Sequence, residues 1–218
     1  MKRIIILLAG IIMVPALMSA QNAWADYERY AEANAALDKA PKAVLMGDSI
    51  TDGWPVADAG FFADNNFAGR GISGQVTSQM LLRFRQDVVD LNPKYVVILA
   101  GTNDIAGNYG TIDLEKTFAN IVSMCEIAKA NKIVPVLCSV LPVAEYPWNL
   151  AVKDVPATIM RLNDMLREYA RKNRIRYVDY HSAMKDERNG LPVNLAADGV
   201  HPTLEGYRIM EALLLEAL

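Results

Sequence analysis

Three residues carry side chains whose types and spacing suit acyl transfer to and from a serine. The hydroxyl of Ser49 is a weak nucleophile until a base removes its proton, and a histidine suits that task near neutral pH. His201 is one of two histidines in the chain, and Asp198 precedes it by three residues. A carboxylate at that spacing can fix the imidazole tautomer and stabilise the imidazolium ion. The three residues predict a catalytic triad with Ser49 as nucleophile, His201 as base and Asp198 as the orienting acid.

Two more residues are suitable donors to the oxyanion that forms when a serine attacks an ester. Gly74 offers the backbone N–H group of a glycine, and Asn103 offers a side-chain amide. Such donors stabilise the negative charge that develops on the former carbonyl oxygen. We therefore expect both residues to line an oxyanion hole.

The elements that must position these residues alternate along the chain. Short apolar runs predict buried strands at 43–46, 95–100, 133–140 and 175–178, and a further strand is expected near Phe67. Helical spacing of apolar residues predicts helices at 26–39, 76–89, 114–130, 156–172 and 203–215. Alternating buried strands and helices indicate a three-layer α/β sandwich with a parallel sheet of about five strands. Ligands of such sheets bind at the carboxyl ends of the strands, where the candidate residues stand.

Four sequence segments resemble the conserved blocks of the SGNH hydrolases, also called GDSL-like esterases and lipases. They occur in the family's order and span residues 47 to 201: Gly47-Asp48-Ser49-Ile50, the stretch around Gly74, Gly101-Thr102-Asn103-Asp104, and Asp198-Gly199-Val200-His201. The resemblance implies a flavodoxin-like α/β/α fold and a carboxylic ester hydrolase with no metal or organic cofactor. It also implies that the backbone N–H of Ser49 joins Gly74 and Asn103 in the oxyanion hole.

The sequence departs from the family pattern at three positions. Ile50 stands where the family name has leucine, Gln75 where many members have aspartate, and Gly69 where many have asparagine. None of these is a catalytic position. The departures therefore bear on subgroup and specificity rather than on activity.

Four residues are candidates for substrate contact. Arg70 lies beside the second block and could bind an anionic substrate, although a salt bridge to a neighbouring carboxylate is an equal alternative. Trp54 and two aromatics of the long irregular stretch 141–155, Tyr146 and Trp148, could line the acyl or alcohol pocket, or could serve only in packing.

Several functions compete. We favour hydrolysis of short-acyl, acetyl-type esters on carbohydrate, with a lysophospholipase or thioesterase acting on longer acyl chains as the alternative. Metal-assisted hydrolysis is a third candidate, and a non-catalytic glycan-binding protein, which would be expected to lack one of the triad residues, is a fourth. The carboxylates and imidazole to consider for a metal are Asp48, Asp52, Asp104, Asp198 and His201. Catalytic metal sites usually contain more imidazoles or a paired carboxylate core.

The N-terminus has the features of a secretory signal peptide. Lys2 and Arg3 precede an apolar stretch, and small residues allow cleavage after Ala20 or Ala25. A retained membrane anchor is less favoured, because Pro15 interrupts a run already shorter than a span requires. The prediction is an exported protein, periplasmic or secreted, whose residues 26–218 form one catalytic domain without stable membrane insertion.

The charge and the cysteines limit partners and cross-links. The full chain has a net charge of −3, and removal of two leader cations leaves 20 basic against 25 acidic residues, or −5. An acidic chain has no electrostatic surface for nucleic acid. Cys125 and Cys138 could pair in an oxidising compartment, but buried free thiols are favoured because one is predicted mid-helix and the other near a strand end.

Overall fold

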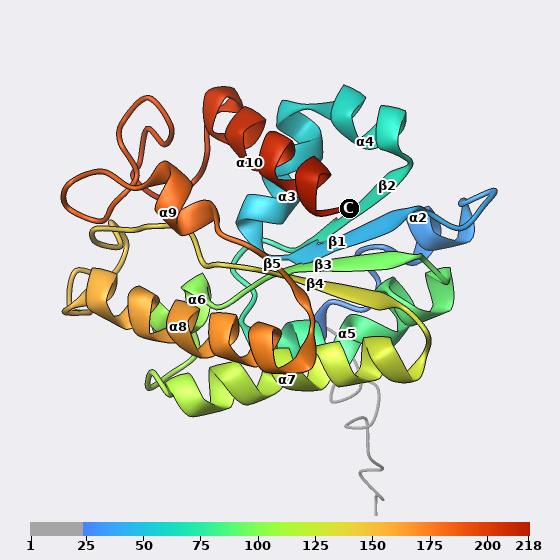
Figure 1. Cartoon of the computed structure of the whole chain (residues 1–218), viewed down its shortest axis with the longest axis horizontal. Helices are drawn as coiled ribbons and strands as arrows, with labels where there is room; N and C mark the ends of the chain where they lie inside the picture. The colour runs from blue at the N-terminus through green and yellow to red at the C-terminus, as the bar shows by residue number, and fades with distance from the viewer. Residues whose placement is uncertain (1–23) are drawn as a thin grey trace, which may run out of the picture.

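The centre of the molecule is a five-stranded sheet in which every neighbouring pair of strands is parallel (Figure 1). The computed structural model describes residues 24–218. The strands run in the spatial order β2-β1-β3-β4-β5. Their bounds are β1 Ala43–Gly47, β2 Phe67–Gly71, β3 Tyr95–Leu99, β4 Val134–Cys138 and β5 Arg176–Val178.

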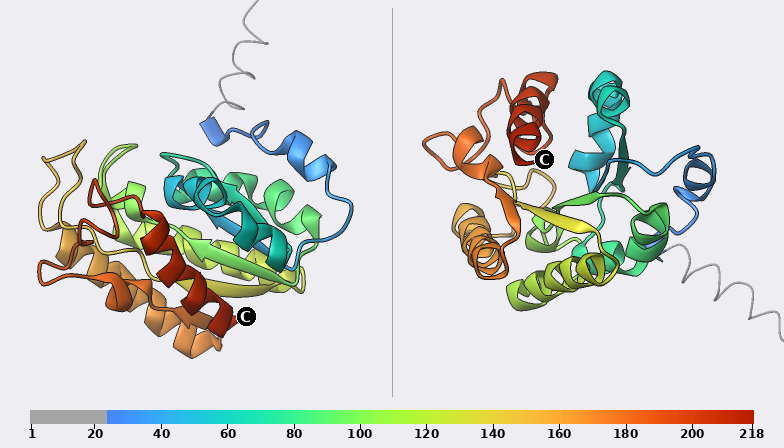
Figure 2. Two further views of the ribbon diagram at one scale, coloured as in Figure 1. Left: turned by 90° about the horizontal axis from the view of Figure 1, so that it is seen from above. Right: turned by 45° about the vertical axis from the view of Figure 1, so that its right-hand side comes forward.

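Helices cover both faces of the sheet (Figures 1 and 2). One face carries α5 (Thr77–Asp87), α7 (Leu114–Ala130) and α8 (Val155–Asn173); the other carries α3 (Ser49–Ala57), α4 (Ala59–Asn65), α9 (Tyr180–Met184) and α10 (Leu204–Ala217). Short helices α2 (Ala31–Ala35) and α6 (Thr102–Ile105) and a 3₁₀ turn (Val89–Leu91) complete the set. The predicted three-layer α/β sandwich is confirmed.

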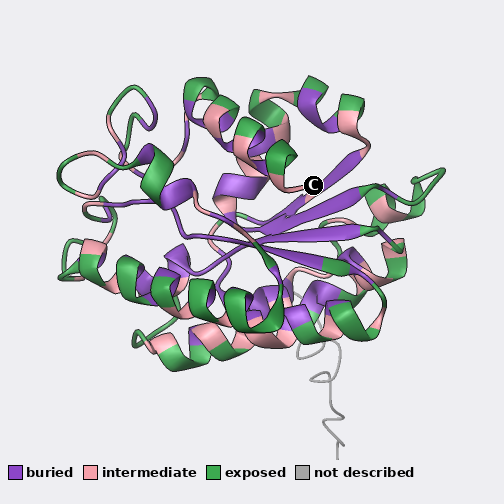
Figure 3. Ribbon diagram, in the orientation of Figure 1, coloured by how far each residue is buried: buried purple, intermediate pink, exposed green. Residues whose placement is uncertain are grey.

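Strands β1 and β3 are buried at every position because their side chains alternate between two apolar clusters, one on each face of the sheet (Figure 3). In β1, Val44 and Met46 pack against α5 and α7, whereas Ala43 and Leu45 pack against α3, α4 and α10. A strand covered on both faces needs apolar residues at every position. This is why β1 and β3 could be identified from continuous apolar runs.

Cys125 and Cys138 are free and buried, as the sequence favoured. Cys125 belongs to the cluster beneath α7, and Cys138 points to the cluster on the opposite face of the sheet. Burial raises the pKa of both thiols to about 12, so neither forms a reactive thiolate near neutral pH.

The structure corrects the predicted helix at 26–39. Only Ala31–Ala35 is helical, and turns precede it, with Asp26 at a positive φ of 54°. The backbone carbonyl of Tyr27 accepts a hydrogen bond from the Gln86 side chain of α5 instead of from a continuing helix. Helices α3 and α4 were not predicted from the sequence, because Gly53, Pro55 and Gly60 interrupt the helical pattern.

Strand register brings the candidate loops to one edge of the sheet. Gly47 of β1 pairs with Gly71 of β2 on one side and with Leu99 of β3 on the other. The three loops that follow these strands therefore begin at the same level. Because β1 lies between β2 and β3, these loops flank the point where the strand order reverses, the usual binding crevice of open α/β sheets.

The predicted signal peptide lies almost wholly in residues 1–23, outside the described part of the chain. Within residues 24–218, no helix combines the length and the apolar character needed to cross a membrane.

Candidate active site

Ser49, His201 and Asp198 form a continuous hydrogen-bonded relay. Ser49 Oγ lies 2.9 Å from His201 Nε2, and His201 Nδ1 lies 2.6 Å from Asp198 Oδ2. With the ring proton on Nδ1, the Nε2 lone pair faces the serine hydroxyl, which is the tautomer a general base needs. Residues 152 positions apart in sequence are thus brought into the arrangement that their types predicted.

The local fold holds each member of this relay. Ser49 is the first residue of α3, where the first backbone N–H groups have no acceptor inside the helix. Asp198 Oδ1 accepts hydrogen bonds from the backbone N–H groups of Val200 (2.9 Å) and His201 (2.8 Å), which closes the turn between them. Partial burial raises the pKa of Asp198, but these bonds and the His201 ring outweigh it and leave the pKa below its ordinary value. Asp198 is therefore ionised at neutral pH.

The predicted oxyanion donors lie at the same cavity as the nucleophile. Ser49, Gly74, Asn103 and His201 all line one cavity of about 360 Å³. Gly74 has a φ of +79°, a left-handed conformation that favours glycine. Asn103 donates one amide hydrogen to the Gln75 carbonyl at 3.1 Å, so its side chain is held beside the Gly74 loop.

Asn108 is a site residue that sequence reasoning missed. Its Nδ2 donates to Asn103 Oδ1 at 2.9 Å, which fixes the orientation of the Asn103 amide, and its Oδ1 accepts from Trp148 Nε1 at 3.1 Å. Asn108 also lines the cavity. Only its position five residues after Asn103 could have indicated it, and that spacing alone is too weak a signal.

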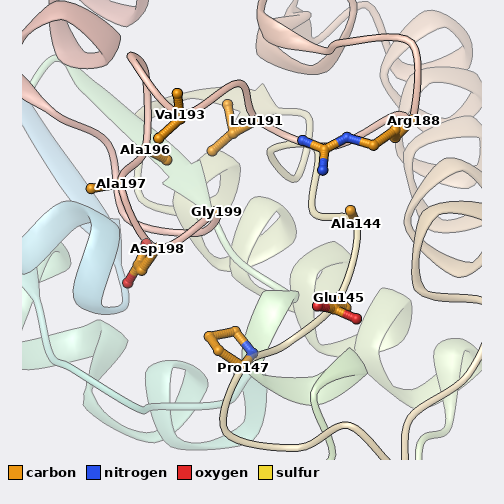
Figure 4. A pocket seen from close by; sticks show the side chains of 10 residues that line it. All are labelled: Ala144, Glu145, Pro147, Arg188, Leu191, Val193, Ala196, Ala197, Asp198 and Gly199. Carbon is orange, nitrogen blue, oxygen red and sulfur yellow. The ribbon is translucent and has the colours of Figure 1, made fainter.

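Two further cavities adjoin the relay. One of about 540 Å³ shares Ser49 and His201 and extends over Asp52 and Val56 of α3. The other, of about 490 Å³, lies beside Asp198 between the 141–155 stretch and the chain leading to His201 (Figure 4).

Trp148 is the one predicted aromatic that reaches the site. Its side chain lines the cavity, and its ring centroid lies 6.2 Å from that of His201. Tyr146 is fully buried behind it, with its hydroxyl 2.9 Å from Thr102 Oγ1 and its ring 5.2 Å from the Trp148 ring. Of the two roles that the sequence left open for Tyr146, the structure places it in packing, since it supports Trp148 without lining the cavity.

Trp54 and Arg70 are buried and are not among the residues that line the two cavities shared by Ser49 and His201; for Trp54 this is the packing role that the sequence left open. Trp54 is 1% exposed, stacks on Phe61 and Tyr207, and donates its indole hydrogen to Glu211 at 3.1 Å. Its apolar ring fills the core between α3, α4 and α10.

Arg70 is buried in β2. Its Nε donates to Asn34 Oδ1 at 2.7 Å, and its Nη1 donates to the Gly69 carbonyl at 2.7 Å. Among residues 24–218 it forms no salt bridge. Arg70 therefore has neither of the two roles considered from the sequence, which were contact with an anionic substrate and a salt bridge to a carboxylate. It anchors the segment that carries Asn34.

The aspartates considered for a metal site do not form a cluster, and each one makes hydrogen bonds or an ion pair with other protein groups. Asp48 caps α3 by accepting from the Ile50 N–H at 3.0 Å, and Asp104 accepts from the N–H (3.0 Å) and hydroxyl (2.6 Å) of Thr77. Asp52 pairs with Arg29. Within the described residues, no group of three histidine, cysteine or acidic side chains is arranged to hold a metal ion.

Comparison with known proteins agrees with this geometry. The model of the GDSL-like lipase/acylhydrolase family matches residues 45–209. A GDSL-like lipase from Bacteroides thetaiotaomicron VPI-5482 is 50% identical, with a TM-score of 0.87, over 89% of this chain and 97% of that one. A proposed acylhydrolase from Bacteroides fragilis NCTC 9343 is 48% identical, with a TM-score of 0.87, over 89% and 96%.

A curated relative matches over a shorter segment. It is an uncharacterised lipoprotein, YqeF, of Bacillus subtilis (strain 168), 36% identical over 78 residues. The matched segment is 34% of this chain and about a third of the length of that protein (32%).

The chain belongs to the GDSL-like lipase/acylhydrolase family, as its four sequence blocks indicated. It is accordingly a carboxylic ester hydrolase.

Proposed function

We propose that the protein is a serine esterase that hydrolyses short-acyl esters through an acyl-serine intermediate. The observation that carries the proposal is the relay of 2.9 Å and 2.6 Å joining Ser49, His201 and Asp198. Both distances are within hydrogen-bond reach for a nucleophile, its base and the group that orients the base.

In the first half of the reaction, Ser49 Oγ attacks the ester carbonyl carbon while His201 Nε2 takes the hydroxyl proton. The carbonyl oxygen becomes an oxyanion that accepts hydrogen bonds from the Ser49 and Gly74 backbone N–H groups and from Asn103 Nδ2. When the tetrahedral intermediate collapses, the bond to the alcohol oxygen breaks and His201 gives its proton to that oxygen. The acyl group remains on Ser49.

In the second half, a water molecule replaces the alcohol. His201 takes one of its protons, the oxygen attacks the acyl carbon, and collapse returns the proton to Ser49 Oγ with release of the carboxylic acid. Asp198, ionised and hydrogen-bonded to Nδ1, stabilises the imidazolium ion at both transition states.

The proposed substrates are acetyl-type esters of carbohydrate. The cavity that holds the candidate oxyanion donors, of about 360 Å³, is the smaller of the two cavities that share Ser49 and His201, which suits a small acyl group. An acetylxylan esterase from Geobacillus stearothermophilus shares the fold, with a TM-score of 0.66 at 20% identity over 83% of this chain and 95% of that one. Longer acyl chains remain the alternative.

Export fits this substrate class. Polysaccharide esters lie outside the cytoplasm, and the basic and apolar N-terminus is typical of a signal peptide. The relative described as a lipoprotein supports the same location.

The test is hydrolysis of p-nitrophenyl acetate, butyrate and octanoate by the wild-type protein and by Ser49→Ala, each with and without a chelator. We expect chelator-resistant activity that is highest on acetate and lost in Ser49→Ala. Activity that survives in Ser49→Ala, or that a chelator abolishes, would refute the serine mechanism. Highest activity on octanoate would refute only the short-acyl preference.

A further inference from the structure

The N-terminal segment, residues 24–35, lies outside the part of the chain that the family model matches. It is hydrogen-bonded to α5, to the loop before α5 and to the end of β2. Side-chain amides of α5 and of the loop before it bind its backbone. The donors and acceptors are Gln79 Nε2 to the Trp24 carbonyl (2.6 Å), Gln75 Nε2 to Ala25 (3.0 Å) and Gln86 Nε2 to Tyr27 (2.5 Å). These three bonds fix the path of the segment along α5.

The second half of the segment is held by β2. The Tyr30 hydroxyl donates to the carbonyl of Gly71, the residue that ends β2. Asn34 accepts from Arg70 Nε and donates to Asp87 Oδ1 at 2.9 Å. The segment is therefore attached to the strand whose following loop carries Gly74.

Gln75 explains one departure from the family pattern. Its amide nitrogen donates to the Ala25 carbonyl, while its amide oxygen accepts from Arg83 Nε at 2.6 Å. An aspartate could accept from Arg83 but could not donate to Ala25. A glutamine at this position thus suits a chain in which an N-terminal segment must be held.

Arg29 is the residue that this segment brings to the active site. It lines the 540 Å³ cavity that also contains Ser49 and His201, and its Nη2 donates to Asp52 Oδ1 at 3.1 Å. Ser73 Oγ donates to the other oxygen of Asp52 at 2.8 Å. The Arg29 side chain remains about half exposed (49%), so its other N–H groups face the cavity and solvent.

The lining of this cavity combines polar and apolar groups. Arg29, Asp52 and Ser73 supply polar groups, which we call the Arg29 wall, and Val56, Ala57 and Pro202 supply apolar ones. A fatty chain in this space would take the exposed N–H groups of Arg29 out of water without giving them hydrogen-bond acceptors, which is unfavourable. A sugar ring offers hydroxyl groups to the Arg29 wall and C–H groups to the apolar residues. A volume of 540 Å³ is within the range of about 300–1,000 Å³ found for small-molecule sites.

We propose that this cavity binds the alcohol portion of the ester, and that the Arg29 wall recognises the hydroxyl groups of a sugar. The N-terminal segment is then a specificity element of the enzyme, because it supplies Arg29. The inference rests on the proposed function, since it needs Ser49 and His201 to act on an ester in the shared space.

The alcohol portion is assigned to the 540 Å³ cavity because the candidate oxyanion donors line the other cavity. Gly74 and Asn103 line the smaller cavity and do not line this one, so the carbonyl oxygen is directed towards the smaller cavity. The leaving oxygen must lie near His201 Nε2, and His201 lines both cavities. The larger cavity, with the Arg29 wall, is the one with room for the larger and more polar half of the substrate.

The experiment compares two substrates on the full exported protein: p-nitrophenyl acetate, whose alcohol has no sugar hydroxyls, and an acetylated xylo-oligosaccharide. The variants are Arg29→Ala and Arg29→Lys, with Arg85→Ala as the matched control because Arg85 is an exposed arginine that lines neither cavity. Thermal unfolding of each variant establishes that it folds.

We expect Arg29→Ala to lower the ratio of kcat/KM for the sugar ester to kcat/KM for p-nitrophenyl acetate by roughly tenfold or more, the loss typical of a hydrogen bond from a charged donor. The loss should come mainly from a higher KM for the sugar ester, and Arg29→Lys should recover part of it. Arg85→Ala should leave the ratio unchanged.

An unchanged ratio in Arg29→Ala would overturn the inference while leaving the serine mechanism intact. Failure of the wild-type protein to cleave the sugar ester, despite Ser49-dependent cleavage of p-nitrophenyl acetate, would overturn it as well. Loss of the proposed function itself has a different signature, namely hydrolysis of p-nitrophenyl acetate that persists in Ser49→Ala.

Discussion

Asp48 places a carboxyl group with a strongly perturbed pKa next in sequence to Ser49, the proposed nucleophile. The side chain is 1% exposed, and burial raises its pKa to about 7 from an ordinary value of 3.8, despite the hydrogen bond from the Ile50 N–H and the nearby His201 ring. Replacement by asparagine keeps an oxygen that can accept from Ile50 and removes the titrating proton. Asp48→Asn is therefore a clean perturbation of charge at this position.

The sign of the effect follows from proton binding in the two states. Between pH 3.8 and about 7 the folded protein keeps the Asp48 proton while the unfolded chain has lost it, so stability decreases as pH rises through this window. The contribution is fully present below pH 3.8 and is lost once the pH passes about 7. From pH 5 to pH 8 the loss covers about two pKa units at about 1.4 kcal/mol each, or about 3 kcal/mol.

Urea unfolding of the wild-type protein and of Asp48→Asn at pH 5, 6, 7 and 8 measures this contribution. Other titrating groups are common to both proteins and cancel in the difference of unfolding free energies. We expect the wild-type protein to lose about 3 kcal/mol relative to Asp48→Asn from pH 5 to pH 8, mostly below pH 7. A difference that stays constant with pH would refute the reasoning, because it would mean that Asp48 does not exchange a proton on unfolding in this range.

Four further outcomes are expected. Asp198→Asn should lower kcat on p-nitrophenyl acetate by roughly 10²- to 10⁴-fold with little change in unfolding temperature, because the imidazole loses the carboxylate that fixes its tautomer. Asn103→Ala should lower kcat by roughly 10²- to 10³-fold with a smaller effect on KM, as one oxyanion donor is lost. Gly71→Ala should lower the urea-unfolding free energy by about 1–3 kcal/mol or more, since its Cβ would lie 2.1 Å from a backbone nitrogen of α3. If the predicted leader is cleaved, intact mass should place the cut after Ala20 rather than after Ala25, because the Ala25 carbonyl accepts a hydrogen bond from a buried amide.

Three of the outcomes have a matched control variant. Asp64→Asn removes an exposed carboxylate that lines none of the cavities at the relay and should leave kcat unchanged; an equal loss there would contradict the role of Asp198. Asn65→Ala serves the same purpose for Asn103. Gly74→Ala has no atom within 4 Å of the added carbon and should cost only the roughly 1–2 kcal/mol of its left-handed φ, so a larger loss than in Gly71→Ala would contradict the steric argument. A mature protein beginning at Asp26 would contradict the structural role of the Ala25 carbonyl.

The fold and the main catalytic candidates could be derived from the sequence because their causes are local. Strands buried on both faces must be apolar at every position, which marked Ala43–Gly47 and Tyr95–Leu99. The alternation of strands and helices then placed the following loops at one edge of the sheet. Ser49, Asp198 and His201 stand in short stretches whose residue types predict their chemistry, and the structure brings all three together.

Side-chain partners distant in sequence were beyond the reach of local patterns. From the sequence, Trp54, Tyr146 and Trp148 are equivalent aromatic candidates for the pocket. Only the packing of the folded chain decides that Trp54 and Tyr146 are buried and that Trp148 faces the cavity. Arg70 beside a catalytic block could equally serve a substrate or the fold, and its contact with Asn34, 36 residues away, assigns it to the fold.

The sequence by itself determined the order of the elements, the edge of the sheet that carries the candidate site, and the residues proposed as its nucleophile and base. The tertiary structure decided which side chains reach that edge. It showed that Asn108 orients Asn103, that the segment before β1 is held by side-chain amides instead of forming one helix, and that this segment brings Arg29 to the cavity beside Ser49. The reason is physical: burial and periodicity act between neighbours in the chain, whereas a hydrogen bond between residues far apart exists only when the whole fold places its donor and acceptor within reach.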